Sequence, residues 1–192
     1  MKKKRIIVAI SGATGSIYGI RLLEALRLKN DVEIHLIISH WAEENIKIET
    51  NYTVEEVRAL AHYNYYDNEM GARISSGSFR ASGMVVIPCS MKTLAAISNG
   101  FAENLVARAA DVMLKEHRSL IIVPRETPLN AIHLDNMLKL AHMGVSIMPP
   151  MPSFYHKPKS IEDLLNHFTG RVLDLLGIEH EMPGRWNDGL ND

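Results

Sequence analysis

The stretch Ile6–Gly19, IIVAISGATGSIYG, decides the fold of this chain. It begins with apolar β-formers, passes into the polar run Ser11–Ser16, and continues as a helical pattern of apolar residues from Ile20 to Leu26. This order predicts a buried strand, a tight turn and a helix. Glycine in such a turn lets backbone N–H groups approach a ligand, and the positive end of the following helix favours an anion. The turn therefore predicts a phosphate site.

The spacing of the glycines makes this prediction depend on the rest of the chain. Gly12, Gly15 and Gly19 match neither the dinucleotide fingerprint nor a P-loop, so a packing turn without a ligand remains an alternative. Ser39 follows the second predicted strand, where a nicotinamide-binding domain places an acidic residue. The lack of an acidic residue at this position argues against NAD as the ligand.

Length and composition limit the class of protein. The chain has 192 residues, 46% of them hydrophobic, which suits one domain over residues 1–192 with a polar tail at 178–192. A net charge of −1 gives no electrostatic reason to expect nucleic acid or an acidic membrane as partner. No run is long enough to span a membrane, and a single cysteine, Cys89, excludes an intrachain disulfide. We expect a cytoplasmic protein.

Strand and helix patterns alternate along the rest of the chain. Further strands are predicted at Val32–Ile38, Met84–Ile87, Ser119–Val123 and Val145–Met148. Helices are predicted at Trp41–Glu49, after Thr53, at Phe101–His117, at Asn130–His142, and from Ser160 through Leu176. Between them, Asn64–Ser82 is predicted to be an irregular, functional connection.

This alternation predicts a three-layer α/β fold, a Rossmann/flavodoxin-like, doubly wound parallel sheet in a single domain. Ligands of such sheets bind at the carboxyl ends of the strands. The polar segments that follow strands should therefore share one edge: Ser11–Ser16, Ser39, Ser90–Thr93 and Arg125–Glu126. Their many hydroxyls and few acids suit a phosphorylated ligand, and the two serine-containing loops together favour a mononucleotide.

Several other side chains could take part in chemistry. Arg125 and Glu126 lie on a loop between two prolines. The arginine could bind a phosphate while the adjacent carboxylate moves a proton. A surface ion pair is the alternative. Lys115 and Arg171 lie on predicted helices and would each be read as solvated charges, and Tyr155 as a packing aromatic. Cys89 is expected to be a small buried residue, and the nine histidines show no metal-ligand spacing, so no metal is expected.

Six motifs, in this order, resemble the UbiX/Pad1 flavin prenyltransferases over about residues 6–186. They are Gly12–Gly15, Pro88–Thr93, Ala109–Val112, Val123–Pro128, His133–Leu138 and Phe154–His156. Within the family, the chain looks most similar to the B subunit of phenolic (hydroxyarylic) acid decarboxylase systems. The resemblance implies an enzyme that joins a dimethylallyl group from dimethylallyl phosphate to N5 and C6 of reduced FMN. The product, prenylated FMN, would serve a separate UbiD-type aromatic acid decarboxylase, and the enzyme would assemble as a homo-oligomer, commonly a dodecamer.

The resemblance also implies roles for individual residues. FMN contacts fall to Gly12, Ala13, Thr14, Ser39, Ser90, Met91, Lys92, Thr93 and Arg125. Contacts with the allylic phosphate fall to Lys115, Arg125, Tyr155 and Arg171, and the catalytic residues would be Glu126, Tyr155, Lys115 and Trp186. Thr14 departs from the serine often found in the family, which puts any role of that small hydroxyl in question. Cations would stabilise the departing phosphate, Glu126 would take the proton lost at C6, and aromatic faces would shelter an allylic cation.

Three alternatives remain at this stage. The related cysteine-decarboxylating flavoproteins use a catalytic histidine, for which His62 has no convincing context, and they differ in the loop at Pro88–Thr93. Direct decarboxylation of phenolic acids is a second alternative, which the shortage of acid/base groups apart from Glu126 opposes. A flavin carrier without catalysis is the third.

Overall fold

The computed structural model describes residues 3–182, and the structural statements below refer to this part of the chain. Its six strands are β1 (Lys4–Ile10), β2 (Val32–Ile38), β3 (Tyr63–Tyr66), β4 (Gly83–Cys89), β5 (Ser119–Pro124) and β6 (Ser146–Ile147). Its seven α-helices are α1 (Ser16–Arg27), α2 (His40–Glu49), α3 (Val54–Ala59), α4 (Met91–Ser98), α5 (Leu105–Lys115), α6 (Ala131–His142) and α7 (Ile161–Leu175). A short 3-10 turn, η1, covers Arg73–Ser75.

All six strands run parallel in one sheet, in the order β3-β2-β1-β4-β5-β6. The first strand lies at the centre, where it pairs with β2 on one side and with β4 on the other. The chain therefore builds outward from β1 in one direction and then returns to build in the other. In sheets of this kind the crevice above the carboxyl ends of the two central strands is where ligands bind. The doubly wound fold predicted from the sequence is confirmed.

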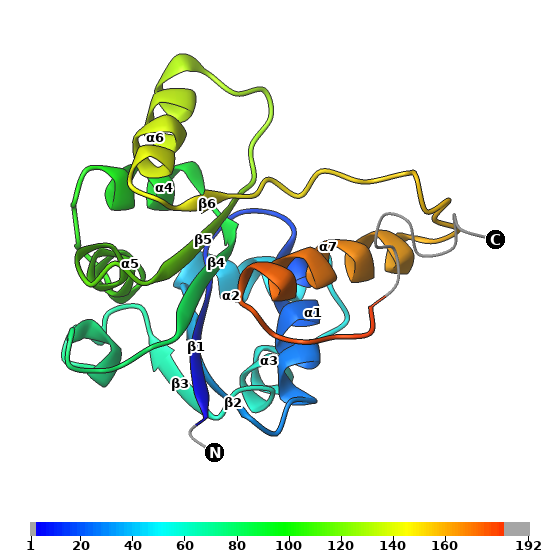
Figure 1. Cartoon of the computed structure of the whole chain (residues 1–192), viewed down its shortest axis with the longest axis horizontal. Helices are drawn as coiled ribbons and strands as arrows, with labels where there is room; N and C mark the ends of the chain where they lie inside the picture. The colour runs from blue at the N-terminus through cyan, green and yellow to red at the C-terminus, as the bar shows by residue number, and fades with distance from the viewer. Residues whose placement is uncertain (1–2, 183–192) are drawn as a thin grey trace.

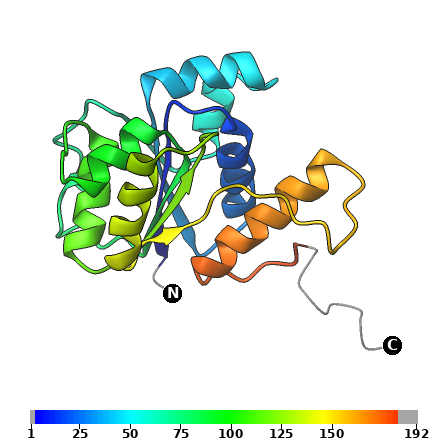
Figure 2. The same ribbon diagram turned by 90° about the horizontal axis from the view of Figure 1, so that it is seen from above.

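Helices cover both faces of the sheet, as Figures 1 and 2 show. On one face α1, α2, α3 and α7 pack over Ile6, Val8 and Ile10 of β1, and on the other α4, α5 and α6 pack over Ile7 and Ala9. This alternation follows from the two-residue period of a strand, and it explains why β1 is apolar from Ile6 to Ile10.

The first helix approaches the sheet closely at Gly19. A Cβ atom at this position would lie 2.6 Å from the carbonyl oxygen of Ile87, in the neighbouring strand β4. A glycine here lets α1 pack tightly against the two central strands, and this fixes the position of the turn before the helix.

The main departure from the predicted elements is β3, a strand that the sequence did not predict. β3 overlaps the start of the stretch Asn64–Ser82 that was predicted to be irregular. It is only four residues long, and only Tyr65 of the four is buried. A short edge strand of this kind has almost no periodic signal. The segment that follows, residues 67–82, is irregular apart from η1, as predicted.

Helix starts are set by capping side chains. Capping boxes begin α3 at Thr53 and α7 at Ser160, the two positions where the sequence predicted helix starts, and Asn130 forms a third before α6. α5 begins at Leu105, four residues later than predicted, because the Asn104 side chain accepts a hydrogen bond from the N–H of Ala107.

The chain beyond α7 packs back against the core. Ile178 is buried, and its N–H donates to the carbonyl of Leu173. Within residues 3–182 no helix has the length and hydropathy required to cross a membrane.

Candidate active site

The polar segments predicted to share one edge are tied together by hydrogen bonds. The Ser11 hydroxyl donates to the carbonyl of Pro88 (3.0 Å) and accepts from the N–H of Ser90 (2.8 Å), which joins the loops after β1 and β4. The Ser39 N–H donates to the last carbonyl of β1 (3.0 Å), and the Arg125 N–H to the last carbonyl of β4 (3.1 Å). The shared edge is confirmed.

A cavity of about 190 Å³ lies at this edge, and the starts of three helices surround it. Its lining is Gly12, Ser39, His40, Trp41, Asp67, Ser90, Lys92, Thr93, Ala96, Glu103, Asn104 and Ala107. Ser39, Ser90 and Asn104 are the N-caps of α2, α4 and α5, and each accepts a hydrogen bond from its own helix. Helix N-termini carry partial positive charge, and three of them at one cavity favour an anion.

Lysine and hydroxyl groups complete the donor set of the cavity. Lys92 is 3.1 Å from Glu103, and its side chain is 81% exposed, so it is free to turn toward an incoming anion. The Ser90 hydroxyl is linked to that of Thr93 at 3.0 Å. Gly12 gives the cavity its width on the opposite side, since a Cβ there would lie 2.6 Å from the Cβ of Trp41.

The N-terminus of α1 differs from the prediction. The N–H groups of Gly15 and Ser16 both donate to one carboxylate oxygen of Glu49, at 2.8 and 3.1 Å. A carboxylate of the chain itself therefore takes the two donors that the sequence assigned to a phosphate. Gly15 makes this turn with φ 98°, in the left-handed region that suits glycine. The cavity between α2, α4 and α5 is a second place at this edge that favours an anion.

Arg125 and Glu126 follow β5 directly and are exposed. The Glu126 carboxylate accepts a hydrogen bond from the N–H of Thr127 at 3.0 Å, which directs it along the loop. Their place at the carboxyl edge agrees with the prediction, and both side chains are accessible to a ligand there.

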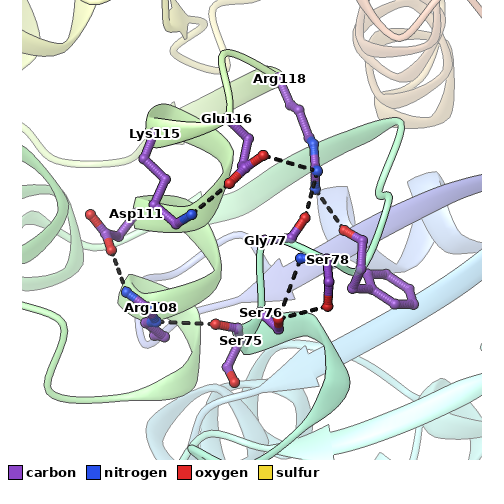
Figure 3. Close-up of polar contacts among 10 residues, drawn as sticks. Ser75, Ser76, Gly77, Ser78, Arg108, Asp111, Lys115, Glu116 and Arg118 are labelled. Carbon is purple, nitrogen blue, oxygen red and sulfur yellow. Dashed lines mark hydrogen bonds and ion pairs between the residues drawn. The ribbon is translucent and has the colours of Figure 1, made fainter.

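Lys115 lies at the opposite edge of the sheet. It is the last residue of α5, close to the beginning of β5, whereas Arg125 follows the end of the same strand. A strand of six residues is about 20 Å long. Figure 3 shows the Lys115 amino group directed at Glu116, 2.5 Å away. Within one chain, Lys115 is therefore not part of the site that contains Arg125.

A loop beside Lys115 is held in a defined shape. The Arg118 guanidinium donates to the carbonyl oxygens of Phe79 (2.6 Å) and Gly77 (2.7 Å), and Arg108 donates to that of Ser75 (3.1 Å) (Figure 3). Lys115 thus stands on an ordered surface.

Tyr155 lies against α7, the helix that carries Arg171, in a third region. Tyr155 belongs to segment 148–160, which leaves β6 and reaches α7 (Figures 1 and 2), and its hydroxyl is 2.6 Å from Nε2 of His167. Arg171 lies one turn further along α7, paired with Asp174 at 2.7 Å. Trp186 lies outside the described residues.

Three residues near the site were not found from the sequence. Trp41 lines the cavity although it is 70% exposed, and its only signal was its position two residues after Ser39. Asn104 gave a capping signal before α5, and this would have placed it at the edge. Glu49 comes from the end of α2 and meets α1 through tertiary structure alone.

The other reactive side chains have structural roles. Cys89 is fully buried, and burial raises the pKa of its thiol, as expected for a residue that packs in the core. Nδ1 of His62 accepts from the N–H of Ile34 in β2, far from the loops at the carboxyl edge. Residues 3–182 contain no group of three potential metal ligands.

The fold and the site define a doubly wound α/β protein with a cavity at its switch point that favours an anionic ligand. Residues 1–173 match the Flavoprotein family. The flavin prenyltransferase LpdB of Lactiplantibacillus plantarum is 53% identical over 183 residues, which cover 95% of this chain and 98% of that protein.

Two solved structures show the same fold. AnUbiX (PadA1), crystallised with FMN and dimethylallyl pyrophosphate, has a TM-score of 0.94 and 55% identity, covering 97% of this chain and 98% of that one. A dodecameric FMN-dependent UbiX-like decarboxylase from Escherichia coli O157:H7 has a TM-score of 0.94 and 52% identity, covering 95% of this chain and 99% of that one. The chain belongs to the Flavoprotein family and, within it, to the UbiX/Pad1 flavin prenyltransferases.

Proposed function

We propose that this protein joins a dimethylallyl group from dimethylallyl phosphate to N5 and C6 of reduced FMN, giving prenylated FMN. The observation that carries the proposal is the cavity at the switch point, where three helix N-termini, a lysine and several hydroxyls meet. This donor set fits the phosphate of a mononucleotide, and the family assignment identifies that mononucleotide as FMN.

The residues of the carboxyl edge fit FMN in a specific way. The phosphate would be held by Ser39, Ser90, Lys92 and Thr93, with the N–H groups at the starts of α2 and α4. The loop Gly12–Thr14, Met91 and Arg125 would contact the remainder of the flavin. The buried Ser16 hydroxyl lies beside this loop and has no hydrogen-bond partner among the described residues, which is consistent with a ligand nearby.

Cationic side chains would activate the allylic phosphate. FMN supplies the nucleophilic atoms N5 and C6, and the chain must help the phosphate to leave. Arg125, Lys115 and Arg171 stabilise the negative charge that grows on the departing phosphate. Glu126, next to Arg125, accepts the proton released when the ring closes at C6. Tyr155 donates to the phosphate, and the resemblance assigns a catalytic role to Trp186.

The active site would be completed by further copies of the chain. Lys115 and Arg125 lie at opposite ends of β5, so a single chain does not bring them to one phosphate. The E. coli relative is dodecameric. The exposed Leu134 and Leu138, four residues apart on α6, offer an apolar surface for such contacts. We therefore infer a homo-oligomer, a dodecamer as in that relative, in which neighbours share each site.

The product would pass to a separate UbiD-type decarboxylase of an aromatic acid. This step follows from the chemistry of prenylated FMN, which this protein would make but not use. Adding the purified product to such a decarboxylase should restore decarboxylation, and unmodified FMN should not.

The direct test is anaerobic incubation of the protein with reduced FMN and dimethylallyl phosphate, followed by mass spectrometry of the released flavin. A flavin heavier by one C5 unit supports the proposal, and a parallel reaction with the diphosphate gives the donor preference. Bound but unmodified FMN would contradict the proposal and favour a flavin carrier. Loss of CO₂ from an added phenolic acid or cysteine peptide would favour a decarboxylase.

A further inference from the structure

A tight turn brings two aromatic side chains of segment 148–160 against α7. The N–H of Lys157 donates to the carbonyl of Phe154 at 3.0 Å, and Lys157 has a left-handed φ of 51°. The turn places the Tyr155 hydroxyl 2.6 Å from Nε2 of His167. The ring of His156 stacks on that of His167, with centroids 4.7 Å apart and planes within 11°.

Helical spacing places His167 between other polar groups. Asp163, His167 and Arg171 are four residues apart along α7 and share one face of the helix. Asp163 is occupied at the helix start, where it accepts from the N–H groups of Lys159 (2.7 Å) and Ser160 (3.0 Å). Arg171 is 54% exposed at its side chain, and Tyr155 is 46% exposed, so both can reach a ligand outside the helix. His167 contacts Tyr155 and lies one helical turn before Arg171.

The direction of the Tyr155 hydroxyl proton determines whether Tyr155, hydrogen-bonded to His167, can bind a phosphate. A tyrosine hydroxyl has one proton to donate and two lone pairs. A phosphate oxygen is an acceptor, so Tyr155 binds it only if that proton points at the phosphate. The short bond to His167 must then be donated by Nε2–H, because a bare Nε2 would take the same proton.

We propose that His167 is a positioning residue for the donor phosphate, which it serves by fixing Tyr155 as a hydrogen-bond donor beside Arg171. The inference rests on the proposed function, which assigns Tyr155 and Arg171 to that phosphate. His167 acts through Tyr155 and needs no contact with the reacting carbon. The region around Tyr155, His167 and Arg171 is then a prearranged phosphate subsite within one chain.

The protonation of His167 also gives the subsite a pH dependence. Histidine changes charge between about pH 5 and 8. The imidazolium donates a stronger, charge-assisted bond to Tyr155 and adds positive charge near the phosphate. Among the described residues, the charged or titratable groups next to it include Tyr155 and His156 from segment 148–160 and, by helical spacing, Asp163 and Arg171 from α7. On the side of α1, Arg21 is paired with Glu162. Donor affinity should fall as pH rises through the imidazole titration.

The test measures donor binding without turnover. Calorimetry with the FMN-loaded protein, without a reductant, gives the Kd of dimethylallyl phosphate for wild type, His167→Phe, His167→Gln and Tyr155→Phe. We expect His167→Phe to raise this Kd about tenfold, because the orienting donor is lost. His167→Gln keeps an N–H at the same reach and should restore most of the affinity.

A pH series separates positioning from simple structural support. The second ionisation of the phosphate, at about pH 6, affects all the proteins alike. The Kd of His167→Gln divided by that of wild type therefore reports the effect of the imidazole alone. That ratio should fall toward one as pH rises from 6 to 8. Melting temperature and FMN affinity should stay unchanged, because the FMN cavity is built from other elements.

Each contrary result has a defined meaning. An unchanged or lower Kd in His167→Phe, with Tyr155→Phe weakened, would overturn the inference and leave the role of Tyr155 intact. The same would follow if His167→Gln behaved like His167→Phe, or if the ratio were flat with pH. An unchanged Kd in Tyr155→Phe would instead remove the assignment of Tyr155 on which the inference depends.

Discussion

The carboxyl edge of the sheet and the region around Tyr155, His167 and Arg171 are built in opposite ways. At the edge, loops from β1, β2, β4 and β5 are joined by backbone hydrogen bonds, and three capped helices begin at one cavity. Around Tyr155, an exposed turn packs on α7 through side-chain contacts, among them the short Tyr155–His167 hydrogen bond and the His156–His167 ring stack. Under the proposed function, the elements around the cavity all come from one chain, whereas the donor phosphate would also need Lys115 from another copy.

Removal of the proton acceptor is the largest effect that we expect. Glu126→Gln should bind FMN as wild type does and slow prenyl transfer by about 10²–10⁴-fold, because a positioned base contributes that much. Single-turnover mass spectrometry of the flavin measures the loss. Glu44→Gln, an exposed carboxylate of α2 paired with Lys47, is the control and should be neutral. Full activity in Glu126→Gln would remove Glu126 from the mechanism.

Mixed assemblies test whether the two halves come from different chains. Lys115→Ala should lose about 10²-fold in rate, as expected when one group that stabilises the transition-state charge is removed. Co-assembly with equal amounts of Glu126→Gln should restore about a quarter of the wild-type rate, since a quarter of sites then draw both residues from intact chains. Rates no higher than those of the separate variants would show that both residues act within one chain.

The fold and the edge could be predicted because their signals are local. Apolar strands and capped helices alternate, and the rule for parallel sheets brings Ser39, Ser90 and Arg125 to one side without knowledge of any contact. Glu49 could not be predicted at the start of α1, because the end of one helix meets the start of another through packing. β3 was missed because four residues at a sheet edge carry too little pattern. The separation of Lys115 from Arg125 follows from chain direction in the α5–β5 pair, which resemblance alone does not reveal.

Trp41 provides a test of the flavin half alone. Trp41→Ala should weaken FMN binding about three- to tenfold, because the cavity loses an aromatic wall, and Trp41→Phe should retain most of the affinity. Titration followed by flavin fluorescence gives both constants. The Kd of dimethylallyl phosphate should not change. An unaltered FMN affinity in Trp41→Ala would place the flavin elsewhere along the edge.

The smallest effect that we expect is a loss of folding stability at acidic pH, which arises in β2, one of the strands that lead to the cavity. His35 is buried in β2, with Nδ1 3.0 Å from the Tyr65 hydroxyl and Nε2 2.9 Å from Glu33. Burial lowers the pKa of His35 below its usual value, so the unfolded chain takes up a proton that the folded protein resists. Stability should therefore be full above the unfolded pKa of about 6.5 and fall as pH drops below it.

Melting temperature measured between pH 5 and 8 shows this slope. His35→Gln, which keeps a donor for Glu33, should flatten much of it, and the remainder is expected from His62, whose pKa burial also lowers. An unchanged slope in His35→Gln would place the titrating group elsewhere.

The position of Lys115 and Arg125 at the two ends of one strand also has a genetic consequence. If neighbouring chains share each site, a cell that carries two alleles builds mixed assemblies, and the phenotype of an allele depends on its companion. Alleles damaged at opposite edges would complement each other, whereas an allele damaged at both edges would disable sites in chains that are themselves intact, and would behave as dominant. Selection at the loop beside Lys115 would then act through the chemistry of a neighbouring chain.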